Sequence, residues 1–199
     1  MKWMLNEFAK SGFAKLLKPF ENSIDDVVKI TRAFGIATKA HTGQFRDGNN
    51  TEPYINHPLR VALILTEEIQ IHDADLVCTA LLHDIIEKSN GSIDEDQLKN
   101  DFGEHVYNMV HAVTRPKIKN EVREKVLDEY FHNIATGSRF IRYIKLADRL
   151  DNIRALKNAL HKDKLMRYKE ETQKYILPIA EKTDEKIVFK LSVALYELK

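Results

Sequence analysis

The spacing of the apolar residues is the feature that most limits how this chain can fold. Val27, Ile30, Phe34 and Ala37 recur three or four positions apart, the spacing that places side chains on one face of an α-helix. The same period runs through most of the sequence, and no stretch shows the convincing alternation of a half-buried strand. Only 7 Gly and 5 Pro occur, too few for a sandwich of many short strands. The sequence therefore predicts an all-α fold without strands.

Capping and turn-forming residues predict where several helices begin and end. Ser23 is a suitable first residue for the helix that carries this face. The stretch "RDGNNTEP" (46–53) interrupts the period with loop-forming residues, and Pro58 suits the first turn of the next helix. Asp73 or Asp75 can begin the helix after that. Further helices are expected over about 94–101, 104–113, 121–135, 139–160, 163–181 and 184–197.

The length of 199 residues and the hydrophobic fraction of 43% predict one globular domain over residues 1–199. Residues 1–20 and 184–199 are expected to form flanking helices. In the first of these, Phe13 and Leu16 lie on one helical face with lysines opposite. We expect this helix to pack on the core of its own domain; the alternative is a helix that lies on a membrane surface.

The charge and the cysteine content of the chain indicate which partners and which cellular compartment to expect. The 31 basic and 30 acidic residues leave a net charge of +1, so no nucleic-acid partner is expected. No continuous apolar segment predicts a signal peptide or a membrane span, so no membrane partner is expected either. The single cysteine, Cys78, excludes an internal disulfide and favours the cytoplasm. We expect Cys78 to be a core residue, and the sequence sets no expectation for the oligomeric state.

The stretch "LLHDIIEKSN" (81–90) places ionisable side chains where the helical pattern predicts core. His83 and Glu87 lie four positions apart on the apolar face of a predicted continuous helix, with Asp84 beside His83. Buried ionisable groups cost free energy unless they are paired or bound to a metal ion. One interpretation is that His83 and Asp84 pair and cap a neighbouring helix. The other is that both are metal ligands.

Two further segments favour the metal interpretation. His57 lies at the start of a predicted helix, and Asp148 interrupts an apolar helical face in "YIKLADRLDNIRAL" (143–156), one turn before Asn152. Together with the His-Asp pair, these two histidines and two aspartates from three helices could surround one divalent ion. Mixed imidazole and carboxylate ligands suit Mn²⁺ or Fe²⁺, and Zn²⁺ is possible. Such an ion polarises a phosphoryl oxygen and lowers the pKa of a bound water.

The order of these residues resembles that of the HD-domain metal-dependent phosphohydrolases. The surrounding sequence resembles the hydrolase domain of the RelA/SpoT alarmone enzymes, especially its small stand-alone relatives, the small alarmone hydrolases and the metazoan SpoT homologue. The similarity covers about residues 26–181. It rests on five segments in order: "HTGQFR…PYINHP", "LLHDIIE", "FGEHVYNMVHAVTR", "IKLADRLDNIRAL" and "EETQKYILPIA".

The resemblance implies a catalytic metal centre. His57, His83, Asp84 and Asp148 match the family's ligands for Mn²⁺, and Glu87 matches the glutamate that orients or deprotonates the attacking water. The implied reaction removes the 3′-pyrophosphate from a guanosine polyphosphate, ppGpp or pppGpp.

The resemblance also implies substrate-binding residues. Asn152 matches an asparagine near the nucleotide, and Arg46 matches an arginine that packs on the base. Lys117 and Lys119 lie in a basic loop where the family is also basic. This loop either meets an anionic substrate or is a solvated face.

Three positions depart from the family pattern. Lys88 stands where the family has an aspartate, Asp47 where it commonly has a lysine, and Ala155 where the long enzymes often have a threonine. Lys88 has three interpretations: a solvated side chain at a helix end, a ligand for substrate phosphate that replaces the charge lost at position 47, or a change that damages the site. These departures leave open ppApp, pppApp or NADPH as the substrate, or a catalytically weakened nucleotide-binding regulatory module.

Overall fold

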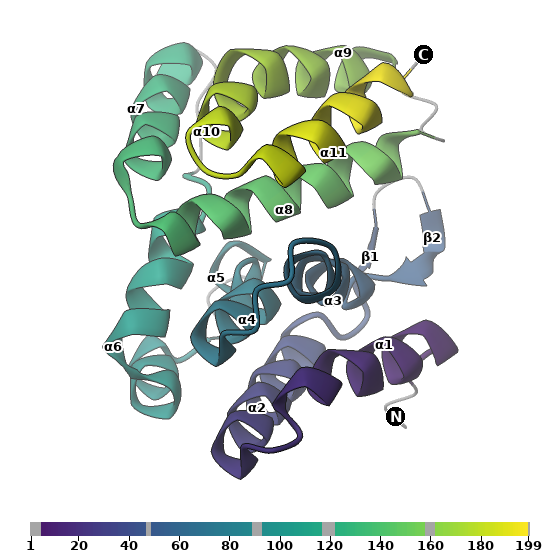
Figure 1. Ribbon diagram of the computed structural model, residues 1–199, viewed down its shortest axis with the longest axis vertical. Coiled ribbons are helices and arrows are strands. Elements are labelled where there is room, and N and C mark those ends of the chain that lie inside the picture. The colour runs from purple at the N-terminus through teal and green to yellow at the C-terminus, as the bar shows by residue number, and fades with distance from the viewer. Residues whose placement is uncertain (1–4, 47–48, 89–92, 117–121, 158–161, 199) are drawn as a thin grey trace. The chain divides into compact units, whose positions relative to one another are not determined.

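The helical period of the sequence is realised in both parts of the chain, and the prediction of an all-α fold is confirmed (Figure 1). The computed structural model describes residues 5–46, 49–88, 93–116, 122–157 and 162–198. Two units, residues 1–111 and 112–199, hold most of their contacts internally, and each is described by itself. The organisation of residues 1–199 as a single domain stays a prediction.

The first unit is built around four helices, α1 to α4, whose packing does not follow their order in the sequence. Helix α4 packs against α2 and α3, and α1 packs against α3. The helices and strands of this unit are α1 (Glu7–Leu17), α2 (Ile24–Ala40), β1 (Phe45–Arg46), β2 (Asn49–Pro53), α3 (Asn56–Leu63), α4 (Ala74–Leu82), α5 (Ile85–Lys88) and most of α6 (Glu95–Val113). A single π-helical turn (Ile64–Glu68) extends α3.

Two helix starts in the first unit agree with the sequence. The Ser23 side chain accepts a hydrogen bond from the backbone N–H of Asp26 and caps α2. Asp73, rather than Asp75, caps α4 by accepting from the backbone N–H of Leu76 at 2.9 Å. In each helix a side-chain oxygen satisfies a backbone donor of the first turn, which has no partner inside the helix.

The terminal helix α1 packs on the unit's own core, as expected. Ala9 and Leu16 are fully buried, and the ring of Phe13 stacks on Phe34 with centroids 4.1 Å apart. Cys78 is buried in α4, which confirms it as a core residue, and burial raises the pKa of its thiol to about 12. Among the described residues, none of the helices is long and apolar enough to cross a membrane.

The prediction that the chain contains no strand is wrong at one place. Phe45 pairs with Pro53 and Arg46 with Asn49, so β1 and β2 form a short antiparallel hairpin with an irregular register. Gly43 lies in the turn that connects α2 to β1, and its φ of 74° lies in the left-handed region that glycine adopts readily. The alternation of apolar and polar residues that predicts longer strands reflects one buried face. A hairpin this short does not need such a face, and its sequence lacks the alternation.

The helix expected to continue through residue 87 also breaks. Helix α4 ends at Leu82, and α5 begins at Ile85, leaving His83 and Asp84 at a turn between them. The backbone N–H of Lys88 donates to the carbonyl of Asp84 and closes the next turn. Glu87 is therefore positioned by α5, a single helical turn, and not by α4.

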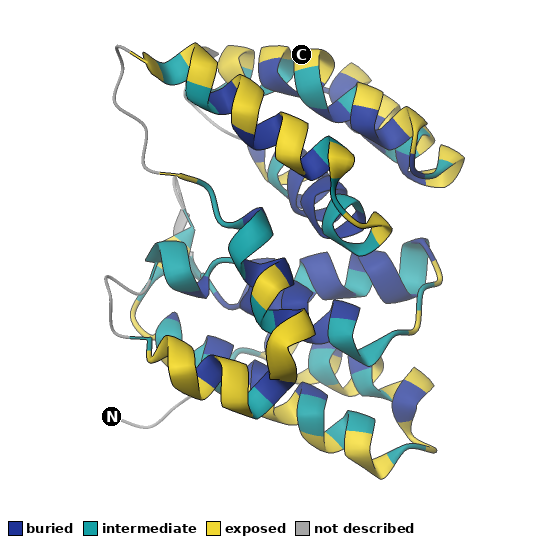
Figure 2. Ribbon diagram, turned by 90° about the vertical axis from the view of Figure 1, so that its left-hand side faces the viewer, coloured by how far each residue is buried: buried dark blue, intermediate teal, exposed yellow. Residues whose placement is uncertain are grey.

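The second unit is organised around α8, which packs against α7, α10 and α11. Its residues from Tyr143 to Asp151 are all buried (Figure 2). The helices are α7 (Arg123–Thr136), α8 (Arg139–Leu156), α9 (Lys162–Glu171), α10 (Leu177–Glu181) and α11 (Glu185–Tyr196), with one π-helical turn (Thr172–Ile176) joining α9 to α10.

Candidate metal centre

His83 is the first candidate ligand, and its ring orientation is fixed by the helix end that carries it. The side chain is 3% exposed, and Nδ1 lies 2.8 Å from the carbonyl oxygen of Ala80. A carbonyl oxygen only accepts, so Nδ1 carries the proton and Nε2 has the lone pair in the neutral ring. A backbone carbonyl in this position is the usual partner of a metal-binding histidine.

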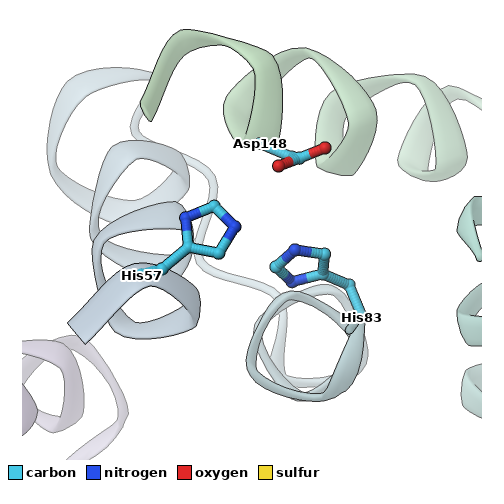
Figure 3. A group of neighbouring side chains, drawn as sticks. All are labelled: His57, His83 and Asp148. Carbon is cyan, nitrogen blue, oxygen red and sulfur yellow. The ribbon is translucent and has the colours of Figure 1, made fainter. Parts of the chain in front are cut away.

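His57 lies in the first turn of α3, where its backbone N–H donates to the carbonyl of Tyr54 at 2.9 Å. Its side chain is 1% exposed. The centroids of the His57 and His83 rings are 5.1 Å apart, and the rings meet nearly edge to face (Figure 3). The structure of the first unit thus brings together two buried imidazoles, one from the first turn of α3 and one from the turn that follows α4.

Asp84 adds a carboxylate to the two imidazoles. Its Oδ2 lies 3.7 Å from His57 Nε2, and its Oδ1 lies 3.4 Å from His83 Nε2. The Tyr54 hydroxyl donates to Oδ2 at 2.5 Å. The Asp84 side chain thus faces two imidazoles and a phenol.

Asp148 lies in the second unit, on a buried part of α8 that Figure 3 also draws. Lys145 Nζ donates to Oδ2 at 2.9 Å, and Asn152 Nδ2 donates to Oδ1 at 2.5 Å. Burial lowers the pKa of Lys145, but the charge of Asp148 and the ring of Tyr130 outweigh it, so this pKa lies above its ordinary value. Lys145 therefore stays charged beside the Asp148 carboxylate.

Glu87 and Lys88 follow the His83–Asp84 turn on α5. The Lys88 ammonium lies 3.5 Å from Glu87 Oε1 and 5.8 Å from the centroid of the Tyr54 ring. The Arg46 guanidinium lies 5.7 Å from the same centroid. Both cations thus lie near the ring of the tyrosine that touches Asp84, and the three interpretations of Lys88 stay open.

The second unit holds a basic pocket of about 240 Å³. It is lined by Arg115, Pro116, Arg123, Arg167 and Tyr168. Lys117 and Lys119, expected to face an anionic substrate, lie outside the described residues, as does Asp47. Ala155 lies on α8, and nothing in the structure explains its departure from the family pattern.

Glu171 gathers three arginines at this pocket. It accepts hydrogen bonds from Arg123 at 2.8 Å, from Arg115 at 3.1 and 3.2 Å, and from Arg149 at 3.2 Å. Burial raises the pKa of the Glu171 carboxyl, but the guanidinium groups of Arg115 and Arg149 lower it more, and its pKa lies below the ordinary value. Arg149 also lies over the ring of Tyr168, 4.7 Å from its centroid.

The sequence did not single out four residues that hold the candidate site. Tyr54 and Gln44 contact the His83–Lys88 segment, Lys145 contacts Asp148, and Arg123 contacts Glu171. The first three lie inside segments that carry the family resemblance. The signal that could have identified these three residues is a polar side chain in the same sequence segment as a candidate ligand.

The described donors suit a divalent ion. His57, His83 and Asp84 offer imidazole nitrogens and a carboxylate in the first unit, and Asp148 offers a carboxylate in the second; both kinds of group are ligands of divalent ions. The donor at His83 Nδ1 is used by a carbonyl, which leaves Nε2 on the side of Asp84. A hydrogen-bonded orientation of this kind is what metal-binding side chains require.

Comparisons with known proteins place this arrangement in a family. Residues 33–184 match the HD domain family model. The chain is 42% identical over 150 residues to a guanosine-3′,5′-bis(diphosphate) 3′-pyrophosphohydrolase of Haemophilus influenzae, covering 73% of this chain but 21% of that enzyme. It is 38% identical over 132 residues to the MESH1 pyrophosphohydrolase of Xenopus tropicalis, covering 66% of this chain and 72% of that protein.

A solved structure gives the same result. It is described as a metazoan ortholog of SpoT that hydrolyses ppGpp, and it matches with a TM-score of 0.74 and 27% identity over 86% of this chain and 97% of its own. The chain therefore belongs to the HD domain family. Its relatives there are MESH1 and SpoT proteins, so the resemblance to the RelA/SpoT hydrolases is confirmed.

Proposed function

We propose that this chain is a Mn²⁺-dependent hydrolase that removes the 3′-pyrophosphate from ppGpp or pppGpp. The observation that carries the proposal is the group of His57, His83 and Asp84, whose ligand atoms converge in the first unit of an HD-domain chain. Relatives named as 3′-pyrophosphohydrolases support the reaction. Water would be added across the bond between the ribose 3′ oxygen and the pyrophosphate, which leaves a nucleoside diphosphate or triphosphate and pyrophosphate.

In this proposal Asp148 completes the ligand set. Its carboxylate is buried and held between Lys145 and Asn152, so its orientation is fixed before any ion binds. The ion would polarise the phosphoryl oxygens and lower the pKa of the attacking water. Asn152 matches a family residue near the nucleotide, and its hydrogen bond to Asp148 would in addition orient that carboxylate.

Glu87 is the proposed general base. It lies three positions after Asp84 on the turn closed by the hydrogen bond from Lys88 to Asp84, so both side chains lie on one side of that turn. The Glu87 side chain is 31% exposed, which leaves it accessible to water. Its carboxylate would accept the proton that the attacking water loses.

The cationic side chains are the proposed substrate ligands. The Arg46 and Lys88 cations lie 5.7 and 5.8 Å from the centroid of the Tyr54 ring, and Arg115, Arg123 and Arg167 line the basic pocket. Arginine and lysine are the usual partners of phosphate groups. We include Lys117 and Lys119 in this proposal from their sequence alone.

The compartment and partners follow from the same features. A single buried cysteine without a disulfide fits a reducing compartment, so we propose the cytoplasm. A net charge of +1 gives no reason to propose nucleic acid as a partner. The proposed partner is a small nucleotide.

A substrate panel tests the function. The protein is incubated with ppGpp, ppApp and NADPH, each with Mn²⁺ and with EDTA, and released pyrophosphate or phosphate is measured together with the metal content of the same sample. The expected result is EDTA-sensitive release of pyrophosphate from ppGpp. Release from ppApp or NADPH alone would reassign the substrate, and tight binding of ppGpp without release would indicate a regulatory binding module.

Lys88→Asp tests whether this lysine binds substrate phosphate. Loss of a charge-assisted hydrogen bond is expected to raise KM for ppGpp about 10-fold or more. Lys88→Met is the comparison, because it removes the charge but keeps the apolar part of the side chain. It should also raise KM for ppGpp. Faster hydrolysis by Lys88→Asp with an unchanged KM would show that Lys88 weakens the site and is not a phosphate ligand.

A further inference from the structure

The segment from His83 to Lys88 carries two proposed ligands and the proposed base, yet it has little secondary structure of its own. Helix α4 ends before it, and α5 is a single turn of four residues. An isolated helical turn is unstable because fixing its backbone costs more conformational entropy than one hydrogen bond returns. Contacts from elsewhere must therefore determine where these side chains lie.

The first such contact is made by Tyr54 at the start of the segment. Its hydroxyl donates to Asp84 Oδ2, while its backbone N–H donates to the carbonyl of Gln44 at 2.9 Å. The centroid of its ring lies 4.7 Å from that of His41 and 5.7 Å from that of His57. The phenol is thus held on several sides and fixes one oxygen of Asp84.

The second contact is made by Gln44 at the end of the segment. Its Nε2 donates to the carbonyl of Lys88 at 3.0 Å and to that of Ala40 at 3.3 Å. Both partners are acceptors, so the amide orientation is determined, and Oε1 accepts from His41 Nδ1 at 2.9 Å. Burial lowers the pKa of His41, which favours the neutral ring that donates from Nδ1.

We propose that Tyr54 and Gln44 are positioning residues that hold the two ends of the 83–88 segment. Tyr54 orients Asp84 for the metal ion, and Gln44 holds the helical turn that carries Glu87. The roles are separable, because the contacts lie at opposite ends of the segment. The part that concerns Glu87 rests on the proposed function; the part that concerns Asp84 requires only that the site binds Mn²⁺.

The Tyr54 contact is tested with Tyr54→Phe, which removes only the hydroxyl. Loss of a hydrogen bond that orients a metal ligand typically costs 10–100-fold, so the affinity for Mn²⁺ is expected to fall by about that factor. Free Mn²⁺ is measured by electron paramagnetic resonance during titration of the whole chain, without substrate. Tyr107→Phe is the matched control, because its hydroxyl donates to the exposed carboxylate of Glu95 at 3.2 Å. Unchanged affinity in Tyr54→Phe would overturn this role.

The Gln44 contact is tested with Gln44→Glu and Gln44→Met. Both remove the donor to the Lys88 carbonyl, and the methionine variant adds no charge. Amide hydrogen exchange over residues 85–88 is expected to become about 2- to 10-fold faster, the effect of one lost hydrogen bond. At saturating Mn²⁺, kcat is expected to fall while the affinity for Mn²⁺ is retained. Gln97→Glu, at an exposed position on α6, is the control.

The outcomes separate this inference from the proposed function. Exchange rates and Mn²⁺ affinity are measured without substrate, so they test both contacts even if the panel detects no hydrolysis. If neither Gln44 variant changes exchange over 85–88, the role of Gln44 is rejected whatever the activity. If exchange rises but a functioning enzyme keeps its kcat, Gln44 supports the turn without positioning the base, and the catalytic part is rejected.

Discussion

Replacing His83 or Asp148 is expected to abolish bound Mn²⁺ and turnover together. Each variant removes one proposed ligand, and the remaining imidazole and carboxylate groups leave the ion incompletely coordinated. The measurement is the metal content after dialysis against Mn²⁺, on the same samples used for ppGpp hydrolysis. Full metal content in both variants would contradict the assignment of these ligands.

The choice of substitution matters at Asp148. Asp148→Ala leaves the buried ammonium of Lys145 without its carboxylate, and loss of one partner of a buried ion pair can cost about 3–5 kcal/mol. Asp148→Asn keeps the shape of the side chain, and comparison of its thermal unfolding with Asp148→Ala separates lost ligation from lost stability. His83→Gln serves the same purpose. His132→Ala and Asp163→Asn, at exposed positions, should retain both metal and activity.

Glu87→Gln is expected to retain the metal and lose most of the rate. The amide has nearly the shape of the carboxylate but cannot accept a proton from water. General-base catalysis contributes about 10²–10⁴-fold, so kcat should fall by that factor with little change in Mn²⁺ affinity. The measurement is kcat at saturating Mn²⁺ beside a Mn²⁺ titration.

The control for this variant is Glu104→Gln, at an exposed glutamate paired only with Lys99. It should leave kcat unchanged. A Glu87→Gln protein that lost its metal would indicate that Glu87 is itself a ligand. One that kept its full rate would remove it from the mechanism.

The helices and the ligand candidates could be predicted from the sequence because each leaves a local signal. The helical spacing of the apolar residues predicted the helices, and Ser23 and Asp73 predicted where α2 and α4 begin. His83 and Asp84 attracted notice because they are ionisable groups in an apolar stretch. Each of these signals can be read from neighbouring residues alone. The signal at the ligand candidates depends on their being buried, and the structure confirms that His57, His83 and Asp148 are buried.

The break between α4 and α5 could not be predicted in the same way. The apolar period runs through the break, and the side chain that meets Asp84 there comes from Tyr54, thirty positions earlier. The hairpin of β1 and β2 escaped prediction because strands this short offer too few positions for an alternating pattern to appear. Tyr54, Gln44 and Lys145 were missed because their importance depends on which partners they meet, and sequence spacing does not give those partners.

The arginines around Glu171 have a consequence for the basic pocket. Three guanidinium groups share one carboxylate, so the cluster keeps an excess of positive charge in a partly buried place. The shared carboxylate holds the arginines together, and although burial lowers the pKa of Arg115, Glu171 raises it above its ordinary value. Arg149 Nη1, moreover, is buried without a hydrogen-bond partner among the residues that the structure describes. The three arginines thus depend on one carboxylate, and loss of Glu171 would leave all three guanidinium groups without their shared partner.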